Sequence, residues 1–297
     1  MNQNLFKRLN STYENLEIKD FEEDLSSFRH YFQDFLLPSA KKENSFANTI
    51  DEIDFLLSQY YLIYSELLTS KQNQEMFQND TDKRNYYSGV LFSVKMIFHD
   101  IIIIRNLVII KYESQLKSVL RNLIEKSRIL VLILYDREFA KEFLFNDSNL
   151  SEKERYFKLL KPSKIFKRIE NNYNNLDQKR NEALKNEPLS LVMAKEMYHL
   201  FSDNSIQLAY DDFSKYIHYN DFETIFYHHA EKNRINMSLY QNSSPYFEEL
   251  FNFIIIRISK IAYLLTNYFF LSNIAQNSNH RMRFITFYSF NTMIHFN

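Results

Sequence analysis

The residues best suited to chemistry at neutral pH lie in YDDFSKYIHYND, which runs from Tyr210 to Asp221. Ser214 and His218 are four residues apart, so one face of a helix would carry both. His218 there can act as a general base or donate a hydrogen bond to a phosphate. A nucleophilic Ser214 would also need an oxyanion hole, which no sequence feature predicts. His218 is therefore the candidate base and Ser214 its neighbour, unless both are structural residues beside a buried face.

A second group of charged residues lies in SQLKSVLRNLIEKSRILVLILYD, from Ser114 to Asp136. Helical spacing places Arg121, Glu125 and Arg128 on one face. After Arg128 the sequence is apolar almost all round the helix, which predicts burial. Charges that enter a buried region must be paired, because desolvation of an unpaired charge is costly. The alternative is a surface ion pair that contributes only a few tenths of a kcal/mol.

These two helices carry a family resemblance. The pattern R-x-x-x-E at Arg121 and Glu125, followed by S-x-x-x-H at Ser214 and His218, resembles a bacterial family of all-helical proteins of unknown function. That family is similar to the HEPN-like helical ribonucleases and their inactive relatives in toxin–antitoxin and phage-defence systems. The resemblance covers residues 85–230 and implies a helical core that binds RNA or a protein partner.

The local cleavage motif of HEPN ribonucleases, R-x(4–6)-H, is absent, since no Arg in the chain has a His five, six or seven residues later. Any catalytic site must therefore be assembled from two helices. The predicted composite site consists of Arg121, Glu125, Ser214 and His218.

A basic stretch, KERYFKLLKPSKIFKR, occupies residues 153–168. Lysines at steps of three can follow a phosphate backbone, which predicts a nucleic-acid-binding edge. The candidates are Lys158, Lys161, Lys164, Lys167 and Arg168. A solvated charged face is the alternative, because Pro162 interrupts the helix and the net charge of the chain is only −1.

Several kinds of chemistry are excluded. The chain has one glycine, Gly89, whereas phosphate-binding P-loops and dinucleotide fingerprints need several. It has no cysteine, so thiolate metal sites and cysteine nucleophiles are absent. The single E-x-x-H, at Glu196 and His199, lacks the second copy that a di-iron bundle needs. We expect no metal and no nucleotide or other cofactor.

Composition and periodicity predict an all-α fold. One Gly and four Pro stand beside 28 Phe and 21 Tyr in 297 residues, and 45% of residues are hydrophobic. Glycine averages about 7% of residues in proteins and is frequent in hairpins and phosphate loops. A bias towards AT-rich codons accounts for part of this shortage. We expect a bundle of long buried helices with no sheet.

Two apolar runs raise the question of a membrane. Ile101–Ile110 is too short to span one, and Phe251–Ile274 contains Arg257 and Lys260. Buried helices explain both runs better. The N-terminus has no apolar core typical of a signal peptide, which predicts a cytoplasmic protein.

Apolar periodicity predicts helices between the polar breaks and the prolines, with two candidate helices between Tyr86 and Tyr135 that join near Lys111. Asn171–Asn186 is either a loop or an exposed helix. The expected domains are an N-terminal helical segment at 1–80, a main helical core at 84–275 and a poorly patterned tail at 276–297.

The leading interpretation is a bacterial defence or toxin–antitoxin type effector with a HEPN-like core, which binds or cleaves RNA or binds a protein partner. The alternative is a non-enzymatic helical protein-interaction module with structural polar clusters. The sequence leaves open whether the protein is an enzyme and whether it forms homo-oligomers.

Overall fold

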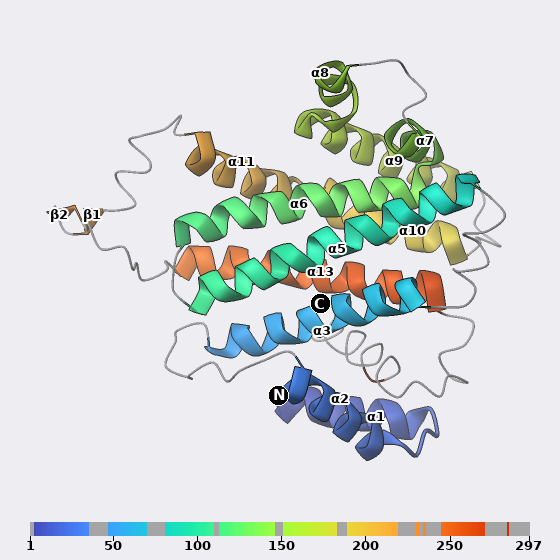
Figure 1. Ribbon diagram of the computed structural model, residues 1–297, viewed down its shortest axis with the longest axis vertical. Helices are drawn as coiled ribbons and strands as arrows, with labels where there is room; N and C mark the ends of the chain where they lie inside the picture. The colour runs from blue at the N-terminus through green and yellow to red at the C-terminus, as the bar shows by residue number, and fades with distance from the viewer. Residues whose placement is uncertain are drawn as a thin grey trace. The chain divides into compact units, whose positions relative to one another are not determined.

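The computed structural model confirms an all-α protein (Figure 1). It describes residues 3–35, 47–69, 81–109, 113–145, 151–182, 189–218, 230–231, 234–235, 245–270 and 284. Two two-residue strands, β1 (Ala230–Glu231) and β2 (Arg234–Ile235), pair antiparallel, with Ala230 opposite Ile235. All other secondary structure in the described ranges is helical.

The helices follow the predicted apolar segments closely. They are α1 (Gln3–Asn15), α2 (Phe21–Phe35), α3 (Ala47–Thr69), α5 (Thr81–Ile109), α6 (Glu113–Tyr135), α7 (Arg137–Phe145), α8 (Glu152–Arg155), the π-helical turn η1 (Tyr156–Leu160), α9 (Pro162–Glu182), α10 (Leu189–Ser202), α11 (Asn204–His218) and α13 (Pro245–Phe270). Pro162 and Pro245 each occupy the first helical position, where the missing N–H costs nothing. The described part of the ambiguous stretch 171–186 is helical and belongs to α9.

The chain divides into two compact units. The first comprises Met1–Glu66 and Ile255–Asn297, and the second comprises Leu67–Ile254. The sequence predicted instead that all of the last long helix belongs to the main core. The division falls inside that helix, so its second part groups with the N-terminal helices.

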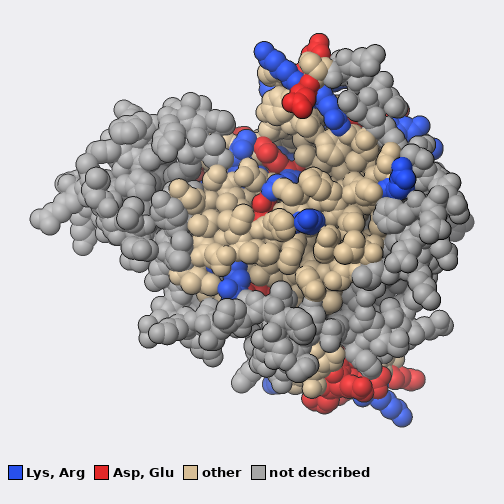
Figure 2. Space-filling view, viewed as in Figure 1, with Lys and Arg blue, Asp and Glu red and all other residues tan. Residues whose placement is uncertain are grey.

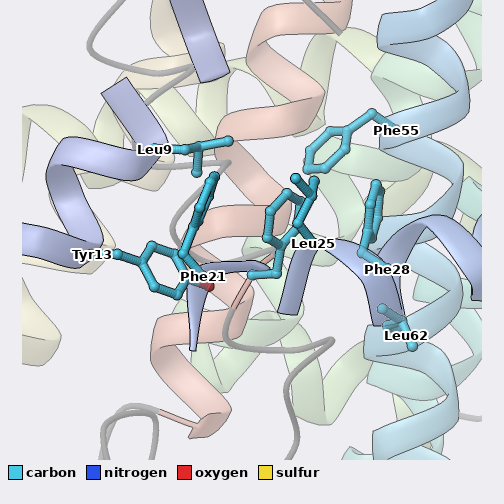
Figure 3. Close-up of a cluster of buried hydrophobic side chains, with 8 residues drawn as sticks. Leu9, Tyr13, Phe21, Leu25, Phe28, Phe55 and Leu62 are labelled. Atoms are coloured by element: carbon cyan, nitrogen blue, oxygen red, sulfur yellow. The ribbon is translucent and has the colours of Figure 1, made fainter. Parts of the chain in front are cut away.

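The first unit is organised around aromatic side chains. The ring centroid of Phe284 lies 4.8 Å from that of Phe28 and 6.5 Å from that of Phe21. Figure 3 shows Phe21 and Phe28 among the buried apolar side chains of this unit. The buried cluster comprises Leu9, Tyr13, Phe21, Leu25, Phe28, Phe55, Leu62 and Phe284. Tyr13 donates a 2.6 Å hydrogen bond to buried Asp24, which satisfies both polar groups inside the cluster.

The second unit is built on α5 and α6, which lie side by side (Figure 1). Leu116, Leu120 and Leu123 of α6 are buried, and so is every residue from Leu130 to Leu134, where the sequence predicted burial after Arg128. Gly89 lies where α5 meets α7, and a Cβ there would collide with a δ-methyl group of Leu144. The only glycine of the chain thus permits a close helix approach.

The run Ile101–Ile110 is too short to span a membrane by itself, but its described part is the end of a 29-residue helix, α5. Among the described residues, α5 from Arg84 to Ile109 is the one helix long and apolar enough to cross a membrane. Half of its most apolar window is buried among other helices. The core helix of a water-soluble protein can meet the same criterion.

Asp136 joins four helices at the end of α6. Its Oδ1 caps α7 by accepting a 2.9 Å hydrogen bond from the backbone N–H of Phe139. Arg168 of α9 donates to both carboxylate oxygens, at 2.6 and 2.9 Å. Asn172 donates to Oδ2 at 2.9 Å and lies 3.2 Å from the hydroxyl of Tyr198 on α10.

The electrostatics of Asp136 follow from these contacts. Burial raises the pKa of this carboxyl, but the hydrogen bonds from Arg168, Phe139 and Asn172 together outweigh burial and hold the pKa below its usual value. The same pairing raises the pKa of Arg168. The charged form of Asp136 is thus the one that the fold stabilises.

We predict that Asp136→Asn lowers the free energy of unfolding by about 2–4 kcal/mol at pH 7, because a charged acceptor of several part-buried donors is lost. The folded-state pKa of Asp136 is depressed, so its contribution is fully present above the unfolded pKa of about 3.9. That contribution is lost as pH falls through the lower folded pKa. Urea denaturation of both proteins between pH 7 and pH 3 measures it.

The matched control is Glu142→Gln. Glu142 is 3.5 Å from Lys158 and 3.9 Å from Arg168, and its side chain is 42% exposed. Exposed pairs of this kind contribute little, so the free energy of unfolding should change by no more than about 0.5 kcal/mol. Equal losses in the two variants, or a loss in Asp136→Asn that persists unchanged in acid, would contradict the assignment.

Candidate functional site

The predicted charged trio on α6 meets the serine on α11. Arg121 Nε donates a 3.0 Å hydrogen bond to Ser214 Oγ, and Arg121 Nη2 lies 3.0 Å from Glu125 Oε1. The Tyr210 hydroxyl donates to the same oxygen of Glu125. Ser214 Oγ donates at 2.8 Å to the carbonyl of Tyr210. We call Arg121, Glu125, Tyr210 and Ser214 the α6–α11 cluster.

The fourth predicted member, His218, is the last residue of α11 and lies one helical turn after Ser214. Its side chain lies outside the described residues. The role of His218 as a base therefore stays a prediction, and so does its meeting with Arg121 and Glu125.

The α6–α11 cluster satisfies its own hydrogen-bonding groups. The guanidinium of Arg121 is held by Ser214 and Glu125 and also lies 4.9 Å above the ring of Tyr210. Burial, with the hydrogen bond to Glu125, raises the pKa of Tyr210, so its phenol stays neutral. Such a closed network fixes α11 against α6 and leaves Ser214 no adjacent base among the described side chains.

Arg128 is different because it is buried and lacks hydrogen bonds. Its side chain is 1% exposed, and none of its guanidinium nitrogens has a hydrogen-bond partner in the described part of the chain. The guanidinium lies 5.0 Å from the ring of Phe166 and 5.5 Å from that of Tyr210. Burial lowers the pKa of Arg128 to about 10, although the nearby charges of Asp211 and Glu125 oppose this. Arg128 is thus still charged at neutral pH.

The nucleic-acid candidates divide into engaged and free side chains. Arg168 is held by Asp136, and Lys158 lies 3.5 Å from Glu142. The other three, Lys161, Lys164 and Lys167, are exposed at the start of α9. The first turn of α9 carries no acidic residue. These three lysines alone remain available to a phosphate backbone.

The E-x-x-H pair does not form a metal site within the described structure. Glu196 and His199 are both exposed on α10, and the His199 ring stacks on Tyr173 at 5.5 Å. Among the described residues, no group of three or more His, Asp or Glu side chains is placed to hold a metal ion.

An open acidic pocket lies in the first unit, outside the predicted sites. It has a volume of about 620 Å³, and Glu14, Glu17 and Glu22 contribute its acidic lining. Figure 2 shows acidic side chains gathered at the lower edge of the molecule, over α1 and α2. The positive φ of Glu17, 56°, sets the turn between these helices.

Sequence reasoning missed Asp136 as the central residue of a network, together with its partners Asn172 and Tyr198. One signal was present, since an Asp directly after an apolar helix and three residues before Phe139 fits an N-cap. The partners on α9 and α10 follow only from helix packing. The contact of Phe166 with Arg128 was missed for the same reason.

Comparisons with protein-family models, with curated proteins and with solved structures find no match to this chain.

We predict that Arg128→Met leaves the free energy of unfolding unchanged or raises it by about 1–4 kcal/mol. A buried charge without hydrogen bonds is costly, and Met fills a similar volume and packs well against aromatic rings. Thermal and urea unfolding at pH 7 measure the difference. A loss of more than about 1 kcal/mol would show that Arg128 has a stabilising partner in solution.

Arg121→Met is the matched control on the same helix. It removes a guanidinium that does have partners, so Glu125 Oε1 and Ser214 Oγ each lose the donor that Arg121 supplies. The free energy of unfolding should fall by about 1–3 kcal/mol. If Arg128→Met raises the free energy of unfolding and Arg121→Met lowers it, the opposite signs distinguish the unpaired charge from the paired one.

Proposed function

We propose that this chain is a non-enzymatic helical protein-interaction module in which the α6–α11 cluster is structural. The observation that carries the proposal is a row of large apolar side chains exposed on α5. Phe92 is 62% exposed, Ile103 44% and Ile102 37%. Exposed apolar patches with polar neighbours are typical of protein–protein contact surfaces.

The state of the α6–α11 cluster supports a non-enzymatic role. A catalytic serine or arginine must present a free group to the substrate, yet Arg121 and Ser214 donate to groups of the protein itself. The phenol of Tyr210 stays protonated because burial raises its pKa. The cluster thus functions as a clamp between two helices.

A photoreactive benzoylphenylalanine in place of Phe92 tests the proposal. In cells, it should cross-link to a second protein on irradiation, because Phe92 lies in the proposed contact surface. The control places the same amino acid at Leu208 of α11, which is 69% exposed. Cross-links at Leu208 but not at Phe92, or at neither position, would refute the interaction surface on α5.

A second candidate function retains the resemblance to HEPN-like proteins, namely a cytoplasmic phage-defence or toxin–antitoxin type effector that binds or cleaves RNA. The observation that favours it is the exposure of Lys161, Lys164 and Lys167 at the start of α9 without an acidic neighbour in the first helical turn. Ammonium groups near a helix N-terminus, where backbone N–H groups are free, can bind phosphates.

Filter binding of a single-stranded RNA at 50 and 200 mM salt tests this candidate. If the three lysines bind phosphates, log K should fall linearly with log salt, with a slope of about −0.7 for each contact. The double variant Lys164→Glu/Lys167→Glu should then lower the magnitude of that slope by about 1–2. Lys95→Glu is the matched control on α5. A slope near zero would exclude RNA binding, and intact cellular RNA after expression of the chain would exclude cleavage.

A further inference from the structure

The exposed face of α5 has the spacing of a helix-pairing seam. We define the α5 stripe as Phe92, Lys95, His99, Ile102, Ile103 and Asn106, all of which are exposed. Positions 92, 95, 99, 102 and 106 follow one another at steps of three and four residues. Positions of a coiled-coil seam recur at these steps, and here apolar side chains at 92 and 102 alternate with polar ones at 95, 99 and 106. Figure 2 shows a largely uncharged face over α5, interrupted by a few separate basic and acidic side chains.

The charge of the α5 stripe is of one sign. Between Arg84 and Ile109 the only acidic residue is Asp100, which is 4% exposed and accepts a 2.7 Å hydrogen bond from Lys126 of α6. Asp100 therefore cannot neutralise Lys95, which forms no ion pair with the described residues. Lys95 supplies a cation and His99 a hydrogen-bonding imidazole between the apolar side chains of the α5 stripe.

From this pattern we infer that the α5 stripe docks an acidic amphipathic helix of a partner protein. The carboxylates of the partner face Lys95 and His99, and its apolar side chains cover Phe92 and the two isoleucines. Asn106 at a seam position can set the register, as polar residues do in coiled coils. The inference rests on the proposed interaction function and names the chemistry of the partner.

Charge complementarity favours this occupant over a second copy of the chain. In a parallel pair of α5 helices, each Lys95 would face its own counterpart. In an antiparallel pair centred on the stripe, Lys95 and His99 would lie near their counterparts. Neither arrangement supplies a carboxylate, because the stripe contains none. Like charges opposite one another are unfavourable in a helix seam.

The C-terminal residues 275–297 are a poorer candidate for the occupant of the α5 stripe, because they too supply no carboxylate side chain. They include Arg281 and Arg283 but neither Asp nor Glu. A lipid surface also fits less well, because a helix that lies in a membrane interface presents a broad apolar face. On the α5 stripe, Lys95, His99 and Asn106 lie between the apolar residues instead.

A pair of designed peptides tests the inference on the full-length chain. Both are amphipathic helices about three heptads long with leucine at the seam positions. One carries glutamate at the flanking positions and the other carries lysine. Fluorescence anisotropy should show that the acidic peptide binds at least about tenfold more tightly than the basic one. Lys95→Glu should abolish or reverse that preference.

Matched control variants distinguish binding at the α5 stripe from nonspecific binding elsewhere on the protein. Lys164→Glu makes the same charge change at an exposed position of α9 and should leave the preference for the acidic peptide intact. Ile103→Ser should weaken binding of both peptides by about tenfold. Leu208→Ser, which removes a more exposed apolar side chain from α11, should not weaken it.

Other outcomes overturn the inference. Equal binding of the two peptides, or binding of neither, removes the acidic helix as occupant. Lys95-dependent binding to phosphatidylserine vesicles without a peptide preference identifies a lipid surface. Dimerisation that depends on Ile103, measured by sedimentation velocity, identifies a second copy of the chain as the occupant of the α5 stripe. If Phe92 cross-links to a protein but the peptides show no charge preference, the proposed function stands and only the acidic helix is wrong.

Discussion

The carboxylate of Asp136 is the interaction on which the arrangement of the second unit depends. A single side chain ends α6, caps α7, holds α9 through Arg168 and reaches α10 through Asn172. Each of these helices buries an apolar face, but apolar packing alone is non-directional and tolerates sliding. Directional hydrogen bonds to one charged group fix the relative positions of the helices. Lys164 and Lys167 lie on α9 and Lys161 directly precedes it, so the position of all three depends on the same carboxylate.

The two arginines of α6 show how differently similar residues can be used. Arg121 is partly exposed and bonded through Nε to Ser214 and through Nη2 to Glu125, so it stabilises the contact with α11. Arg128, two turns further, is buried between aromatic rings without a hydrogen bond in the described structure. The first contributes to stability, whereas the second opposes it through desolvation. Side-chain chemistry is identical, and only the local environment separates the two roles.

The α5 stripe and the α6–α11 cluster use their side chains in opposite ways. The α6–α11 cluster uses its polar groups internally, whereas α5 presents apolar and basic groups to solvent. A buried polar network gives specificity to the fold, and an exposed apolar seam gives affinity for a partner. This contrast is why we assign the interaction role to α5 and a structural role to the cluster.

The sequence by itself determined the all-α class, the join near Lys111 between the helices α5 and α6, and the burial of α6 after Arg128, because apolar periodicity is a local property. It also selected Arg121, Glu125 and Ser214 as residues that belong together. Only the tertiary structure decided that Tyr210 completes their network, that Asp136 joins four helices, and that Arg128 is left unpaired. It alone showed that one face of α5 stays exposed, since apolar residues all round a helix look the same in sequence whether a neighbour covers them or not. Which faces meet depends on packing between distant segments, and no local pattern encodes that choice.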